Sequence, residues 1–396
     1  MRYQHRSIGR RWRDIAVRAV IGSALVASVA AASAAAEVPR GDVPDGGILD
    51  HGTADVDRDF ESDGYAEYEP FARPFPATTA ASAIVVDRAT GAVIGEKQPD
   101  RLWAPASTTK MMTALLTFEA VDAGTVSLSD TVTIQPDVNI EGGGQIGLAA
   151  GDTISLRDLL HIALLPSEND AASAVGTYVG SQPSGDPSWM GRAAFVQRMN
   201  DRAGELGLSN TRYINIAGRD PEDLGRENDD GTAPEGFWPT QETCSGNDFD
   251  EPPCAHYTTA RDLAALARVA LDEPLFATFV QRTNWRTTTW RSATGAVRDR
   301  TVSNSNQLLP GGSAAYPGVY GVKTGTTHMA RENLVSAASS DSRDVIAVVL
   351  GSDDDSTTVA DRYTDSTALL DWALEPLWNR SDVLLDLTTT RAYPTP

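Results

Sequence analysis

The sequence predicts a mixed α/β (α+β) domain whose sheet combines segments from both ends of the folded part. Short runs rich in apolar and β-branched residues occur near residue 85 and again after residue 319, and segments with helical spacing lie between them. Strands at both ends with helices between them imply a sheet assembled from distant segments. The stretch 81–378 is long enough to bury a substantial core.

The folded part begins with a hairpin and a helix. Residues 83–95 form two apolar runs around a turn, which predicts a β-hairpin. Pro105 precedes a helix that starts close to Ser107, because proline suits the first turn of a helix. Residues 111–118 are apolar on more than one side of that helix, so we expect a buried, central helix.

The remaining elements are less sharply defined. We expect helical segments at 151–180, 192–209 and 259–271, strands at 319–325, 332–338 and 345–351, and a last helix at 359–374. Residues 218–256 are acidic and rich in Gly and Pro, which predicts a long inserted loop.

Both ends of the chain are expected to lie outside this domain. Residues 1–18 carry six arginines and one aspartate, and residues 19–36 carry no charge. This pattern predicts an export signal at 1–36, with an uncleaved anchor as the alternative. Residues 37–80 have too few large apolar residues to bury a core, which predicts a disordered acidic linker. Residues 379–396 are expected to be a short tail.

Charge and cysteine content limit the location and the partners. The net charge is −21, and removal of the +5 segment 1–36 would make it −26. Such acidity argues against nucleic-acid binding and fits an exported, extracytoplasmic protein, either secreted or held weakly at the membrane by its N-terminus. In an exported chain, Cys244 and Cys254 are expected to form a disulfide. A metal pair is the weaker alternative, because no histidine has zinc-motif spacing to them.

Lysine is rare in this chain, and it occurs where its chemistry matters. Only three of the 33 basic residues are lysine. Lysine can lose its proton in a protein, whereas arginine cannot. Lys110 lies three residues after Ser107, so a helix would place both on one face. The amine could then take the proton of the hydroxyl, provided that burial or a second cation such as Lys323 lowers the lysine pKa.

Three short motifs follow one another in specific contexts. They are Ser107-Thr108-Thr109-Lys110 at a helix start, Ser167-Glu168-Asn169 after a helical stretch, and Lys323-Thr324-Gly325 at the end of a strand. Each motif alone is weak, but the ordered set resembles that of the penicillin-recognising serine enzymes. Residues 104–114, 164–172, 256–263 and 345–351 narrow the resemblance to the low-molecular-mass D-alanyl-D-alanine carboxypeptidases.

The resemblance implies a β-lactamase/transpeptidase-like fold, with an antiparallel sheet flanked by helices and a helical subdomain that carries Ser167. It implies removal of the terminal D-alanine from peptidoglycan stem peptides ending in D-Ala-D-Ala. The reaction would pass through an acyl-enzyme on Ser107 and need no cofactor or metal. β-Lactams, which imitate this peptide end, would acylate the same serine.

The resemblance also implies residue roles. Ser107 would attack the carbonyl carbon, Lys110 would take the serine proton, and Ser167 would relay a proton to the leaving amine. Asn169 would hold the substrate, Lys323 and Thr324 beside Gly325 would hold the terminal carboxylate, and the N–H groups of Ser107 and Thr326 would form the oxyanion hole. Arg362 on the last helix is a further candidate for holding a carboxylate.

One departure and three alternatives stay open. Glu168 stands where the family usually has glycine, which could alter substrate preference or raise the pKa of Lys110. A D-Ala endopeptidase uses the same residues. A β-lactamase needs a group that activates the deacylating water, and the chain has no clear Glu-x-x-Leu-Asn segment for this. A non-catalytic cell-wall or β-lactam sensor would not need a nucleophile with its base.

Overall fold

Both ends of the folded chain contribute to one central sheet. The computed structural model describes residues 74–138, 142–182, 185, 189–221, 255–341, 343–353 and 361–374. The five-stranded antiparallel sheet has the order β2-β1-β9-β8-β7. Its strands are β1 (Ser82–Asp87), β2 (Val93–Lys97), β7 (Val319–Thr327), β8 (Arg331–Ser339) and β9 (Asp344–Ser352). The expectation of a sheet assembled from distant segments is confirmed.

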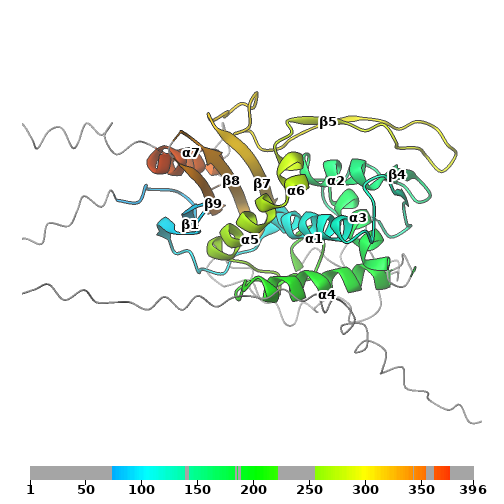
Figure 1. The fold of residues 1–396 in the computed structure, drawn as a ribbon, viewed down its shortest axis with the longest axis horizontal. Coiled ribbons are helices and arrows are strands. Elements are labelled where there is room, and N and C mark those ends of the chain that lie inside the picture. Colours follow the sequence, from blue (N-terminus) through cyan, green and yellow to red (C-terminus); the bar gives the residue numbers. More distant parts are fainter. Residues whose placement is uncertain are drawn as a thin grey trace, which may run out of the picture. The chain divides into compact units, whose positions relative to one another are not determined.

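Helices cover both faces of this sheet (Figure 1). On one face, α7 (Asp361–Leu374) packs against β8 and β9, and on the other α5 (Ala260–Asp272) packs against β1 and β9. Residues 345–350 of β9 are all fully buried, which explains why this strand is apolar without alternation.

The helical part contains the central helix that the sequence predicted. In α1 (Lys110–Asp122), every residue from Lys110 to Phe118 is buried. The helical segment expected at 151–180 is two helices, α2 (Leu156–Leu164) and α3 (Asn169–Ser181). They are separated at Ser167, whose φ of 75° lies in the left-handed region and breaks the helix. The other helices are α4 (Trp189–Glu205) and α6 (Pro274–Val280).

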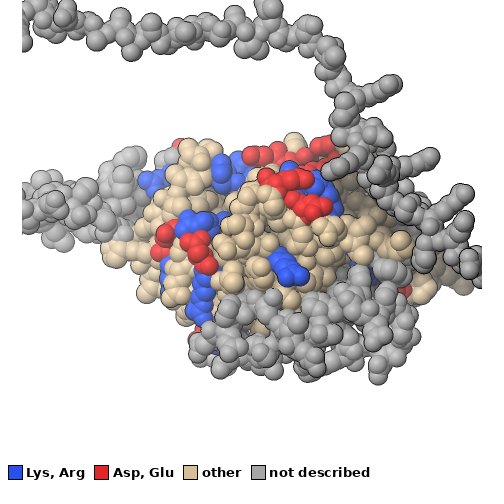
Figure 2. All heavy atoms as spheres, turned by 90° about the horizontal axis from the view of Figure 1, so that it is seen from below, with Lys and Arg blue, Asp and Glu red and all other residues tan. Residues whose placement is uncertain are grey.

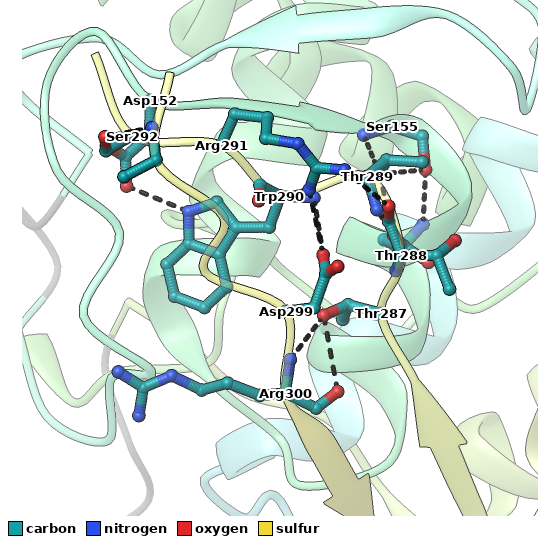
Figure 3. Close-up of polar contacts among 12 residues, drawn as sticks. Asp152, Ser155, Thr287, Thr288, Thr289, Trp290, Arg291, Ser292, Asp299 and Arg300 are labelled. Carbon is teal, nitrogen blue, oxygen red and sulfur yellow. Dashed lines mark hydrogen bonds and ion pairs between the residues drawn. The ribbon is translucent and has the colours of Figure 1, made fainter. Parts of the chain in front are cut away.

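Two small hairpins were not predicted. They pair β3 (Thr131–Thr133) with β4 (Thr153–Ser155), and β5 (Asn284–Arg286) with β6 (Thr301–Ser303). We call residues 284–303 the arm. Figure 3 shows how the arm docks: the buried Trp290 donates a hydrogen bond from Nε1 to Asp152 (2.9 Å), and Thr289 Oγ1 lies 3.0 Å from Ser155 Oγ. Strands of three residues are too short for a periodic pattern to predict.

Seven residues before the predicted start of the domain already belong to it. Residues 74–80 were assigned to the linker, yet Ala80 is fully buried. The Asp365 carboxylate on α7 accepts hydrogen bonds from the backbone N–H groups of Thr79 and Ala80, each at 2.9 Å. Composition could not predict this, because the contacts that hold the segment come from distant residues: Asp365, Lys97, which donates to the carbonyl oxygen of Ala80 (2.7 Å), and Trp372, against which Phe75 packs.

Several sequence-based expectations lie outside the described residues. They are the export signal at 1–36, most of the linker, the Cys244–Cys254 pair, most of the insertion and the tail at 379–396. In the part of the chain that the structure describes, no helix is both long and apolar enough to cross a bilayer.

The visible surface is mixed in charge. On the face shown in Figure 2, acidic and basic side chains of the described residues lie beside one another. Within these residues, that face offers no continuous basic area of the kind that nucleic acids bind.

Candidate active site

Ser107 lies in a tight turn directly before α1. The turn is a 3₁₀ helix, η1 (Ala106–Thr109), and Ala106 has a left-handed φ of 47°. The backbones of two glycines lie in close contact with this turn. A Cβ at Gly218, whose own φ is 91°, would collide with the carbonyl oxygen of Ala106, and one at Gly325 would lie 3.2 Å from the nitrogen of Ser107. Ser107 is therefore fixed from two sides by segments that are far away in sequence.

The surroundings of Lys110 determine where its protons point. Lys110 is fully buried, and its Nζ lies 2.8 Å from each of Ser107 Oγ, Asn169 Oδ1 and the carbonyl oxygen of Ala217. Asn169 Nδ2 donates to the carbonyl of Gly142 (2.8 Å), which fixes the orientation of the amide. The Asn169 and Ala217 oxygens can only accept. A neutral Lys110 would satisfy both with its two N–H bonds and direct its lone pair at the Ser107 hydroxyl.

Lys323 faces the same cavity from β7. Its Nζ lies 2.8 Å from Ser167 Oγ and 3.1 Å from the carbonyl of Thr324. Burial holds the pKa of Lys323 well below its usual range, and the nearby positive charges of Lys110 and Arg362 lower it further. Two ammonium groups near one cavity repel each other, so the simultaneous protonation of Lys110 and Lys323 is unfavourable.

These groups surround a cavity of about 300 Å³. Its lining includes Ser107, Gly144, Pro166, Ser167, Asn169, Gly218, Arg219, Ser305, Thr324, Gly325, Thr326, Thr327, Arg362 and Tyr363. The two lysines lie buried and bonded to Ser107 and Ser167. Apart from the two cysteines, the residues that the sequence analysis selected for the site are therefore brought together.

The sequence analysis missed a segment after α4. Asn215 Oδ1 accepts from the N–H of Gly218 (2.6 Å) and of Arg219 (3.0 Å), which forms the turn that presses on η1. Asp220 accepts from Thr327 Oγ1 (2.7 Å) and so ties this turn to β7. The expectation that residues from 218 onward belong to an inserted loop was wrong for 218–220. The available signal was Asn215 three residues before a glycine, a common turn pattern.

Arg362 and Ser305 complete the cavity wall. The Arg362 guanidinium donates to the carbonyl of Gly325 (2.9 Å) and pairs with Glu332 (2.8 Å). It therefore braces β7 as well as lining the cavity. Ser305 Oγ lies 2.6 Å from Thr324 Oγ1, which places a second hydroxyl at the end predicted to hold a carboxylate.

Comparison with known proteins agrees with this geometry. Residues 69–354 match the sequence profile of a family described as D-alanyl-D-alanine carboxypeptidase. The chain belongs to the D-alanyl-D-alanine carboxypeptidase family. It is therefore a serine peptidase, a hydrolase with a role in the cell wall, and a member of a penicillin-binding family.

Individual relatives support the assignment. The chain is 30% identical over 316 residues to D-alanyl-D-alanine carboxypeptidase DacF of Bacillus subtilis, covering 78% of this chain and 67% of that protein. It is 30% identical over 302 residues to a D-alanyl-D-alanine carboxypeptidase of Streptomyces sp. K15, covering 75% and 88%. The crystal structure of the Streptomyces K15 DD-transpeptidase superposes with a TM-score of 0.60 at 28% identity, covering 76% of this chain and 100% of that one. The β-lactamase/transpeptidase-like fold is thus confirmed.

Proposed function

We propose that this chain removes the terminal D-alanine from peptidoglycan stem peptides through an acyl-enzyme on Ser107. One observation carries the proposal. Lys110 Nζ lies 2.8 Å from Ser107 Oγ while two obligate acceptors occupy its other hydrogen-bonding directions. This is the geometry of a nucleophile with its base.

The acylation step follows from these positions. Ser107 Oγ attacks the carbonyl carbon of the bond between the two D-alanines, and its proton moves to Lys110. The backbone N–H groups of Ser107 and Thr326 stabilise the oxyanion of the tetrahedral intermediate. The C–N bond then breaks, and the leaving amine receives a proton through Ser167.

The ends of the substrate are held by different groups. Lys323 and Thr324, next to Gly325, bind the terminal carboxylate, and the Ser305 hydroxyl beside Thr324 adds a donor. Asn169 holds the acyl part through its amide. Water then attacks the ester carbon of the acyl-enzyme, and the shortened peptide leaves as Ser107 regains its proton. A β-lactam opens its ring on Ser107 by the same first step.

The proposed location follows from the N-terminal sequence and the substrate. Stem peptides lie outside the cytoplasmic membrane, so the enzyme has to be exported. Residues 1–36 serve as the export signal in this proposal, and residues 37–73 join it to the catalytic domain. Retention of 1–36 would give a membrane-attached enzyme instead of a secreted one.

Release of D-alanine from a peptide ending in D-Ala-D-Ala tests the proposal. Residues 37–396 should release D-alanine, and Ser107→Ala should release none above background while it unfolds at the same temperature as the parent. Ser129→Ala, which removes an exposed hydroxyl outside the cavity, is the matched control and should retain full activity. Turnover by the Ser107→Ala variant at more than about 1% of the parent rate would refute the role of Ser107.

A further inference from the structure

Glu168 stands inside the middle motif, yet its carboxylate has no structural task in the part of the chain that the structure describes. Glu168 precedes α3 with an extended backbone (φ −72°, ψ 132°), and its side chain makes no capping hydrogen bond. Its backbone is used: the N–H donates to Ile162 and the carbonyl accepts from Ala172. Among the described residues, no hydrogen bond or ion pair involves the half-buried carboxylate.

The neighbouring acid is a useful contrast. Asp170 accepts hydrogen bonds from the backbone N–H groups of Ile146, Gly147 and Leu148, at 2.9 to 3.2 Å. Asp170 thus holds the segment that follows the glycine run at 142–144. Glu168, two residues away, leaves its hydrogen-bonding capacity unused, although an unpaired half-buried charge is unfavourable.

The Glu168 carboxylate points toward the rim of the cavity. A Cβ added to Gly144 would lie 3.4 Å from Glu168 Oε2, and Gly144 lines the cavity together with Asn169. Burial and the nearby Asp170 raise the pKa of Glu168, while Lys110 opposes the shift. Among the described residues, no ion pair offsets the burial of this carboxylate.

The substrate orientation of the proposed function places a residue near this carboxylate, and the inference rests on that function. The terminal carboxylate lies at Lys323, and the scissile carbonyl lies at Ser107. Asn169 and Gly144 line the same cavity as Ser107, so the chain upstream of that carbonyl can run along them. An extended residue spans about 3.5 Å, and on this path the residue preceding the two D-alanines is the one that would come beside Gly144.

We propose that Glu168 determines specificity by binding an ammonium group on the side chain of the residue that precedes D-Ala-D-Ala. The substrate class is a stem peptide with a free amine at that position. An amine that has been acylated, as in a cross-linked stem, carries no charge and leaves Glu168 buried without a partner. The enzyme should therefore prefer uncross-linked stems.

Two peptides test this proposal. Both end in D-Ala-D-Ala after a residue with a side-chain amine, and they differ only in acetylation of that amine. The parent enzyme should show a kcat/KM about five to ten times higher for the free amine, since a partly buried ion pair contributes roughly 1 kcal/mol. Glu168→Gln should reduce the ratio to about one, chiefly by raising KM for the free-amine peptide.

A second variant shows whether the preference depends on the position of Glu168 or only on the net charge of the protein. Asp122→Asn removes the same charge from an exposed position about 18 Å along α1 from Lys110, and the ratio should stay at the parent value. Rates of Ser107 acylation by a fluorescent penicillin show whether each variant keeps an assembled site.

The outcomes are distinguishable. Equal use of both peptides by the parent, with D-alanine released from each, overturns the inference and leaves the proposed function intact. An equal fall in kcat for both peptides in Glu168→Gln, with a shifted pH profile, means that Glu168 acts through Lys110, and this also overturns the inference. No release from either peptide refutes the proposed function and the inference with it.

Discussion

Lys110 and Lys323 differ in their partners, and this difference fits the two tasks that the proposed function gives them. Lys110 contacts two oxygens that can only accept, so its neutral form fits the site with a lone pair toward Ser107. Lys323 contacts the Ser167 hydroxyl and borders the end of the cavity near Thr324. A proton can leave Lys110 without breaking either obligate bond, whereas in the proposed function Lys323 needs its charge to hold a carboxylate.

The depressed pKa of Lys323 predicts an alkaline loss of substrate binding. Burial, with Lys110 and Arg362 nearby, holds that pKa well below 10.5. As pH rises through it, the ammonium loses its proton and the terminal carboxylate loses its cation. KM for a peptide ending in D-Ala-D-Ala should rise about tenfold or more, at a pH below that at which free lysine titrates, because a charged hydrogen bond contributes about 1.5 to 3 kcal/mol.

A substrate without a terminal carboxylate provides the control. KM for the same peptide ending in D-alaninamide should stay constant over this pH range. If KM for both peptides rises in parallel, the titrating group is not the one that binds the carboxylate.

At the scale of the elements, hydrogen bonds to one buried carboxylate, that of Asp158, hold the arm against α2. Asp158 on α2 accepts hydrogen bonds from Trp285 Nε1 (2.8 Å), from the N–H of Thr288 (2.9 Å) and from Thr289 Oγ1 (2.7 Å). Beyond the arm, the N–H of Ser305 donates to the carbonyl of Leu165 (2.9 Å), just before Ser167. The docked arm therefore supports the segment that carries the middle motif.

Asp158→Asn should destabilise the protein by about 2 to 3 kcal/mol. An amide offers one acceptor oxygen, and its NH₂ group would face either Trp285 Nε1 or the backbone N–H groups of Thr288 and Thr289, which now donate to the carboxylate. Urea unfolding monitored by tryptophan fluorescence measures the change. Asp272→Asn is the control, because Asp272 forms an ion pair with Arg88 and its side chain is 76% exposed, so the change should stay within about 0.5 kcal/mol. Equal stability of the two variants would show that the contacts of Asp158 do not hold the arm.

The elements that the sequence predicted are those with long, apolar patterns. The strands at 319–325, 332–338 and 345–351 all lie within observed strands, because each is mostly buried. The arm depends instead on Asp158 meeting donors 127 to 131 residues away, and no local pattern encodes that meeting. The turn at Asn215 was missed for a different reason: its composition blends into the acidic segment that follows.

At the scale of the whole molecule, the site depends on the pairing of the N-terminal strands with the C-terminal strands in one sheet. β1 pairs with β9, and β7 at the opposite edge carries Lys323 beside η1. The three motifs were recognisable in sequence because each is local, and their order along the chain predicted their meeting through the family fold. The distances and the partners of Lys110 and Glu168 required the assembled structure.

Global stability should fall in acid because buried histidines resist protonation. His161 stacks between the rings of Phe279 (3.9 Å) and Trp285 (3.7 Å), and burial lowers its pKa to about 4. Burial likewise lowers the pKa of His256 to about 3. Between pH 6.5 and these lowered pKa values, the two histidines are protonated in the unfolded chain but neutral in the folded chain. The free energy of unfolding therefore falls from pH 6.5 down to the folded pKa values, although the raised pKa values of Glu168 and Asp262 oppose this trend.

His161→Phe isolates one contribution to this acid sensitivity. Phenylalanine keeps a ring between Phe279 and Trp285, and it removes Nε2, which is buried without a hydrogen-bond partner. Phenylalanine also removes the hydrogen bond between Nδ1 and the carbonyl of Arg157 (2.8 Å), so the variant should stay within about 1 kcal/mol of the parent at pH 7. Each pKa unit corresponds to about 1.4 kcal/mol, so it should lose about 2 to 3 kcal/mol less between pH 7 and pH 4. Urea unfolding at both pH values gives the two differences. An identical loss in parent and variant would mean that His161 is protonated without disturbing the fold, and that its burial between the two rings does not exclude the charged form.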